Sequence, residues 1–186
     1  MRQNYLSASD ALEKLKSGNL VYVSSKISRG DISPQKRLYT SENGQRPYAV
    51  VIACSYSRVI PESIFSAGIG ELFVARVAGN VIDKYQLGSI EYAINNLGCR
   101  LIVVLGHTQC GAVGAAMRPN QEYVKFITDE IKLAIGEELD PFKASILNIR
   151  RSVEKIKSSI KDIDGLQITG AIYHTDSGTV DFDAIK

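Results

Sequence analysis

Two apolar runs, separated by about fifty residues, constrain the fold of this chain more than any other feature. Residues 48–53 (YAVVIA) and 101–105 (LIVVL) are short, rich in β-branched side chains and typical of strands buried on both faces. Two helix-like patterns and a further strand-like run at 71–76 lie between them. This βαβαβ order predicts a parallel sheet with right-handed crossovers, in which residues just beyond the strand ends meet in one crevice.

Potential metal ligands follow both apolar runs. Cys54 comes directly after the first run, and His107 and Cys110 lie in the segment GHTQCG that follows the second. We therefore expect the three side chains to converge. Two thiolates and one imidazole are a common ligand set for Zn²⁺ that leaves one tetrahedral position open. Each residue taken alone also has another interpretation. Cys54 could be an inert thiol of the core, and His107 could be a hydrogen-bonded histidine at a strand end.

The chain before the first run predicts a helical arm, over about 7–46, on a single domain of 1–186 with a core over about 47–186. A capping box at 7–10 starts a short amphipathic helix over 11–16, and we expect Gly18 to end it. The polar stretch 24–46 has the alternatives of a basic binding arm and a solvated connection. We favour the connection, because no aromatic residue lies between the scattered basic residues Lys26, Arg29, Lys36 and Arg37.

The remaining patterns complete an α/β fold with a parallel-centred sheet flanked by helices. Strands are expected at 166–173 and 179–182, joined by a turn at 176–178, and this pair either adds an edge to the sheet or pairs with another subunit. Further expected elements are a helix starting at Pro61, a tight turn at 77–80, a helix over 89–97 ended by Gly98, and helices from Gly111, over about 121–135 and over 145–160.

Composition and charge exclude several classes of protein. A net charge of +2 over 186 residues is too small to indicate binding to nucleic acid or to a membrane surface. The first ten residues lack the apolar core of a signal peptide, so we expect a cytoplasmic protein. Three cysteines cannot all form disulfides with one another, which favours metal binding or free thiols. We interpret Cys99 as a structural thiol and His174 as a surface histidine. No Cys-x-x-Cys redox pair and no Cys-x5-Arg phosphate loop is present.

Four ordered motifs resemble the β-class carbonic anhydrases: CSYSRV at 54–59, FVARVAGN at 73–80, SIEYA at 89–93 and VLGHTQCGA at 104–112. Residues 11–19 and 168–173 also resemble family segments, whereas about 118–165 is unspecific. The resemblance implies reversible hydration of carbon dioxide to bicarbonate by Zn²⁺ held on Cys54, His107 and Cys110. It also implies a homodimer or a dimer of dimers.

The resemblance further implies which residues line the substrate pocket. Gln45, Phe73 and Tyr92 would help to form the carbon dioxide pocket, partly across a dimer interface. Gly111 would lie beside the ligand Cys110.

One position departs from the family pattern Cys-x-Asp-x-Arg, because residue 56 is tyrosine. The family's aspartate pairs with the arginine that corresponds to Arg58, and it orients the reactive group at the zinc. Tyr56 is bulkier, and a phenol with a pKa of about 10 is neutral near pH 7. We therefore expect Tyr56 and Arg58 to give reduced or altered catalysis, unless Tyr56 packs outward and another group takes over.

Two other functions stay open for such a sequence. One is a zinc-binding pseudoenzyme that senses anions through Arg58 or has a structural role. The other is hydrolysis of a sulfur analogue, carbonyl sulfide or carbon disulfide.

Overall fold

A five-stranded sheet forms the centre of the molecule in the computed structural model, which describes residues 5–25, 30–119 and 124–185. The strand order is β2-β1-β3-β4-β5. The first four strands run parallel and β5 is antiparallel to β4. The strands are β1 (Ala49–Ala53), β2 (Leu72–Arg76), β3 (Leu101–His107), β4 (Gln167–Tyr173) and β5 (Val180–Asp181). The predicted parallel-centred sheet is therefore confirmed.

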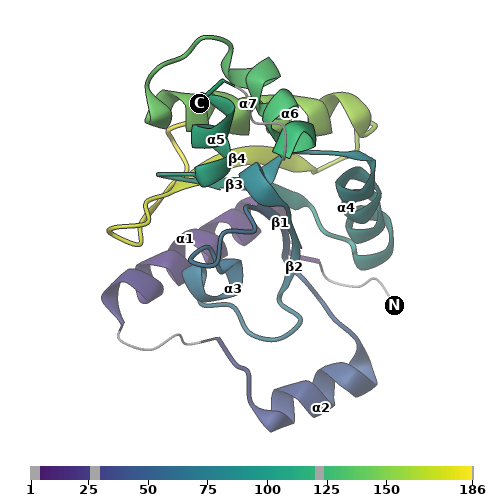
Figure 1. The fold of residues 1–186 in the computed structure, drawn as a ribbon. Coiled ribbons are helices and arrows are strands. Elements are labelled where there is room, and N and C mark those ends of the chain that lie inside the picture. The colour runs from purple at the N-terminus through teal and green to yellow at the C-terminus, as the bar shows by residue number, and fades with distance from the viewer. Residues whose placement is uncertain (1–4, 26–29, 120–123, 186) are drawn as a thin grey trace.

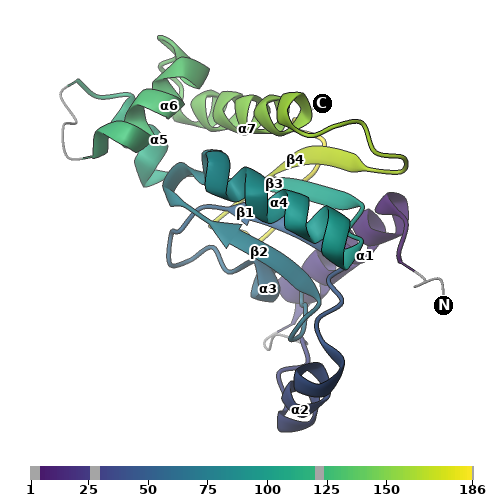
Figure 2. The same cartoon turned by 90° about the vertical axis from the view of Figure 1, so that its right-hand side faces the viewer.

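Helices cover both faces of this sheet, which explains why its central strands are apolar without alternation. Every residue of β1 and β3 is buried. Val51 and Val103 face a core shared with α1 (Ala8–Ser24) and α3 (Pro61–Ile64). Ile52 and Val104 face the opposite core, shared with α4 (Lys84–Leu97) and α7 (Pro141–Ser159). Figures 1 and 2 show the two helical layers with the sheet between them.

The first helix is longer than its sequence predicts. Ser7 caps α1, because its hydroxyl accepts a hydrogen bond from the Asp10 N–H at 3.1 Å. The expected stop at Gly18 is wrong, since α1 continues to Ser24. Gly18 serves packing instead: a Cβ atom there would lie 1.9 Å from the Phe65 carbonyl oxygen, so only glycine permits this close approach of α1 to the end of α3.

The polar stretch 24–46 contains a helix that the sequence analysis missed, α2 (Pro34–Asn43). Ser33 caps it through a hydrogen bond from the Lys36 N–H, and Pro34 occupies its first turn. No residue of α2 is buried, and the helix lies apart from the sheet in both views. An apolar pattern was therefore missing from the sequence because α2 contributes nothing to the core. Lys26 and Arg29 lie outside the described residues.

The other elements follow the predicted order with shifted boundaries. The 3-10 turn η1 (Ala78–Asn80) precedes α4, which begins earlier than expected at a capping box of Asp83 and Gln86 and ends at the left-handed Gly98. The chain continues with α5 (Gly111–Ala116), α6 (Lys125–Ile135) and α7. The helix predicted from about residue 121 corresponds to α6, and residues 121–123 lie outside the described residues. β5 adds an edge to the sheet within the chain. Among the described residues, no helix has the length and apolarity to cross a membrane.

Candidate metal centre

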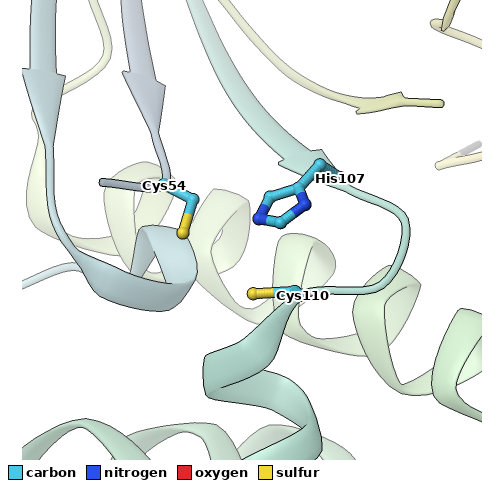
Figure 3. Close-up of side chains that lie close together, drawn as sticks. All are labelled: Cys54, His107 and Cys110. Carbon is cyan, nitrogen blue, oxygen red and sulfur yellow. The ribbon is translucent and has the colours of Figure 1, made fainter. Parts of the chain in front are cut away.

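Three side chains meet at the carboxyl ends of the central strands. Cys54 follows β1, His107 is the last residue of β3, and Cys110 immediately precedes α5. Their ligand atoms all lie within 4.8 Å of one another, and the residues are 4%, 1% and 6% exposed, respectively. Figure 3 shows the two sulfur atoms and the imidazole ring pointing toward one another. The parallel topology thus brings together Cys54 and Cys110, which are 56 positions apart in the sequence.

The imidazole of His107 is oriented by a backbone contact. Its Nδ1 lies 2.9 Å from the carbonyl oxygen of Thr108. A carbonyl can only accept, so Nδ1 carries the proton and Nε2 retains its lone pair. Nε2 is buried and has no hydrogen-bond partner among the described residues. A buried nitrogen of this kind fits a metal ligand, for which the bound cation replaces the missing donor.

A tight turn beside the cluster supplies a hydrogen bond to one of the sulfurs. The N–H of Gly79 donates to Cys54 Sγ at 3.3 Å. Gly79 has φ +69°, and a Cβ atom there would lie 2.7 Å from Ile131 and 3.1 Å from Ala112. Glycine is therefore required both by the left-handed backbone and by the lack of space. The sequence pattern predicts the turn but not this contact, for which the only signal is the glycine before Asn80.

The two thiols of the cluster are coupled. Hydrogen bonds from the Cys110 thiol and from the Gly79 N–H lower the pKa of Cys54 to about 4 despite its burial. The same neighbouring sulfur, together with burial, raises the pKa of Cys110 well above its usual range. The pair thus favours one thiolate and one proton, and a divalent cation that displaces this proton would gain the second thiolate.

Tyr56 stacks directly on the histidine of the cluster. The rings of Tyr56 and His107 are 5.1 Å apart between centroids and inclined by 11°. On Tyr56 in turn lies the Arg58 guanidinium, with Cζ 4.8 Å from the ring centroid. The aromatic ring replaces a carboxylate as the neighbour of Arg58, so the interaction is cation–π rather than an ion pair. Tyr56 is half-buried and packs inward, which does not match the alternative that it points away from the site.

A second arginine fixes the loop that carries Cys54 and Tyr56. Arg76, at the end of β2, donates from Nε to the Cys54 carbonyl oxygen at 3.2 Å and from its terminal nitrogen to the Tyr56 carbonyl oxygen at 2.7 Å. The sequence pattern predicts a strand at Arg76 but no role for its side chain. Its position beside Ala53 in the register of β1 and β2 explains the contact.

Three predicted pocket residues lie elsewhere in the chain. Phe73 pairs with Val50, four residues before Cys54, which corresponds to about 13 Å along the strand. Tyr92 is half exposed on α4, with its ring 6.2 Å from that of Phe73. Gln45 precedes β1 and packs near Gly70, at the opposite end of the sheet. One chain therefore does not bring these residues to the cluster, and their role in a pocket stays a prediction.

Gly111 lies where the sequence predicted it, as the first residue of α5 next to Cys110, and a Cβ atom there would meet nothing within 4 Å. Cys99 is buried and donates its thiol proton to the Pro47 carbonyl oxygen at 3.3 Å, which fits a structural thiol. His174 is only partly exposed, and its ring stacks against Phe142.

Comparison with known proteins identifies the family of the chain. The family model described as carbonic anhydrase matches residues 49–180. A carbonic anhydrase of Mycolicibacterium smegmatis is 35% identical, over 92% of this chain and 91% of that protein. Carbonic anhydrase 2 of Mycobacterium tuberculosis is 48% identical over 107 residues, a match that spans 58% of this chain and only about half (51%) of that protein.

Solved structures give the same class. The β-carbonic anhydrase of Coccomyxa, in complex with acetazolamide, has a TM-score of 0.68 at 21% identity over 81% of this chain and 78% of that one. CafA of Aspergillus fumigatus, also a β-carbonic anhydrase, has a TM-score of 0.66 at 27% identity over 82% and 83%. The fold is therefore that of the β class, and the chain belongs to the carbonic anhydrase family.

Zinc is the cofactor of this family, and the cluster suits it. Two sulfurs and one imidazole nitrogen are ligand types that Zn²⁺ prefers. The free Nε2 of His107 and the closely spaced thiols of Cys54 and Cys110 provide three protein ligands without rearrangement of the backbone. Within the described ranges, these three are the one group of His, Cys, Asp and Glu side chains close enough together to hold an ion.

Proposed function

We propose that this protein is a zinc-dependent carbonic anhydrase that hydrates carbon dioxide reversibly to bicarbonate, with activity reduced by Tyr56. The cluster of Cys54, His107 and Cys110 carries the proposal, because it combines the ligand types of a catalytic zinc site with a place at the carboxyl edge of a parallel sheet. Membership of the carbonic anhydrase family supports the reaction type.

In this proposal Cys54 and Cys110 hold the ion as thiolates and His107 holds it through Nε2. Bound zinc supplies a Lewis acid that makes water nucleophilic near neutral pH. The Thr108 carbonyl keeps the proton on Nδ1 of His107, and the Gly79 N–H stabilises the negative charge on Cys54. The burial of all three ligands excludes bulk water from their side of the site.

Tyr56 limits the rate in this proposal. A neutral phenol lacks the anionic acceptor that a carboxylate offers for orienting the attacking water. The ring is also committed to a stack between His107 and Arg58. Loss of an orienting group typically costs about 10²–10³ in rate.

A second copy of the chain completes the substrate pocket in this proposal. Gln45, Phe73 and Tyr92 lie at the far end of the sheet or on its β2 side, so a partner would have to bring them to the metal centre. We therefore propose a homodimer or a dimer of dimers as the active form. The β-carbonic anhydrases of Sordaria macrospora, which share the fold, are tetrameric.

Stopped-flow hydration of carbon dioxide by zinc-loaded protein tests the proposal. We expect Tyr56→Asp to raise kcat/KM by about 10²-fold, since it restores a carboxylate beside Arg58. Tyr85→Asp is the matched control: it makes the same exchange of tyrosine for aspartate, but at an exposed position in the first turn of α4, where a carboxylate is tolerated. An unchanged or lower rate for Tyr56→Asp would contradict the assigned role of position 56.

The metal requirement is tested on the same preparations. Cys54→Ser should reduce bound zinc from about one ion per chain to nearly none and abolish hydration, because a serine hydroxyl is a poor zinc ligand. Cys99→Ser, at another buried cysteine, should retain the metal. Equal zinc content in wild type and Cys54→Ser, measured by elemental analysis, would refute the site.

The state of Arg58 favours one alternative, a zinc protein that binds anions without catalysis. Its side chain is exposed, lies over the Tyr56 ring and makes no salt bridge within the described part of the chain. A guanidinium without a carboxylate partner attracts an anion such as bicarbonate. Under this alternative the zinc-loaded protein shows no hydration above background and binds bicarbonate in calorimetry, and Arg58→Gln abolishes that binding.

Hydrolysis of carbonyl sulfide or carbon disulfide is tested by supplying these substrates to the same preparation. A carbon disulfide hydrolase shares the fold with a TM-score of 0.51, but at 17% identity it says nothing about substrate.

A further inference from the structure

The turn that donates to Cys54 is itself held from the other side by helix α7. Asn148 donates from Nδ2 to the carbonyl oxygen of Gly79 at 2.7 Å. Ser152 donates from Oγ to the carbonyl oxygen of Asn80 at 3.1 Å. Positions 148 and 152 are four apart, so both side chains project from one face of α7 and bind consecutive carbonyl groups.

The same peptide segment therefore connects α7 to the sulfur. Gly79 accepts from Asn148 through its carbonyl oxygen and donates to Cys54 Sγ through its N–H at 3.3 Å. Asn80, held by Ser152, closes the turn through its own N–H, which donates to the Val77 carbonyl oxygen at 3.0 Å. Displacement of either carbonyl would thus rotate the peptide groups that determine where the Gly79 N–H points.

Both α7 side chains are buried, Asn148 to 2% and Ser152 to 4% exposure. Burying a polar group is unfavourable unless it is hydrogen-bonded, so these two side chains are retained in the interior together with their partners in the turn. Ser145, on the same helix, is as deeply buried at 3%, yet it donates only to Pro141 O in its own helix. The contacts of Asn148 and Ser152 are thus specific to the turn.

We propose that Asn148 and Ser152 are positioning residues of the metal centre, which fix the Val77–Asn80 turn so that the Gly79 N–H stays hydrogen-bonded to the Cys54 sulfur. A hydrogen bond to a thiolate withdraws electron density from it, and thereby tunes its strength as a ligand. The inference rests on the proposed role of Cys54 as a zinc ligand.

Cobalt-substituted protein gives a readout that a purely structural role would not change. The sulfur-to-cobalt charge-transfer band reports the electron density on the thiolates. We expect Asn148→Ala and Ser152→Ala to move this band to lower energy, because the freed turn weakens the hydrogen bond to Cys54. Zinc Kd, measured by competition with a chelator, should rise about 10- to 100-fold, as for other groups that orient metal ligands.

Two matched variants control for the loss of a buried polar group. Ser145→Ala removes a buried hydroxyl from the same helix. Asn19→Ala removes a buried amide that donates to two backbone carbonyls, Ile64 O and Gly178 O, neither of which belongs to the Val77–Asn80 turn. Both should lower the free energy of unfolding while leaving the band and the zinc Kd at wild-type values.

The outcomes separate this inference from the metal site itself. A wild-type protein that binds neither zinc nor cobalt would overturn the proposed site and the inference with it. If wild type binds metal, and folded Ser152→Ala and Asn148→Ala keep its band and zinc Kd, the positioning role is refuted while the metal site stands. Equal shifts in Ser145→Ala or Asn19→Ala would likewise refute it.

Discussion

At the scale of single residues, three buried cysteines differ because of the groups around them. Cys54 receives hydrogen bonds from the Gly79 N–H and from the Cys110 thiol, and both lower its pKa. Cys99 has a carbonyl acceptor, Pro47 O, and its burial raises the pKa of the thiol to about 11. The sequence alone identified Cys99 as structural only because it has no ligand partner nearby.

The raised pKa of Cys99 gives a pH-dependent contribution to stability. In the unfolded chain this thiol ionises near 9.0, whereas in the folded chain it stays protonated to about 11. Its contribution is therefore complete below pH 9 and is lost as pH rises toward 11. We expect the free energy of unfolding of wild type to fall with pH in this window more steeply than that of Cys99→Ala, by up to about 1.4 kcal/mol per pH unit.

Denaturant unfolding at pH 8, 9, 10 and 11 measures this difference. Cys99 should also resist iodoacetamide at pH 8 in the folded protein and react after unfolding. Parallel pH profiles for wild type and Cys99→Ala would contradict the assignment.

At the scale of the elements, sequence patterns predicted the parts of the fold whose stability is local or apolar. The strands around β1 and β3 were predictable because burial on both faces demands continuous apolar runs. The convergence of Cys54, His107 and Cys110 followed from parallel topology. α2 could not be predicted in this way, since none of its residues is buried. The Tyr56 stack and the contact of Gly79 depend on tertiary geometry that no local pattern encodes.

Gly18 illustrates how packing overrides a local signal, and it gives a second prediction. A Cβ atom at 18 would lie 1.9 Å from the Phe65 carbonyl oxygen, a backbone atom that cannot yield without moving α3. We expect Gly18→Ala to destabilise the protein by about 1–3 kcal/mol, although alanine is the better helix former.

Gly88, in α4, is the matched control, because it is exposed and a Cβ atom there would meet nothing within 4 Å. Gly88→Ala should stabilise the protein by about 0.5–1 kcal/mol. Equilibrium unfolding in urea compares the two, and a gain in stability for Gly18→Ala would contradict the close approach.

At the scale of the whole molecule, the separation of Gln45 from the cluster determines how the proposed active site is assembled. If a partner supplies Gln45, a chain with Cys54→Ser and a chain with Gln45→Ala are each inactive alone. In a mixed dimer, one of the two sites combines an intact cluster with an intact Gln45. An equal mixture should therefore recover about a quarter of wild-type hydration activity after random pairing.

Unfolding and refolding the two variants together, followed by stopped-flow assay, measures this recovery. The same mixture without refolding is the control for incomplete exchange. No recovery after confirmed formation of mixed dimers would show that each site is built from one chain.

The two margins of the sheet have unequal capacity to accept another chain. At one edge β5 has only two residues and is antiparallel to β4, which leaves little backbone for a strand of another chain to pair with. On the other side β2 ends the sheet with five residues in regular register. A sheet with only one edge strand long enough to pair can join one other sheet. Intermolecular pairing of strands therefore stops at two chains and cannot propagate into a filament.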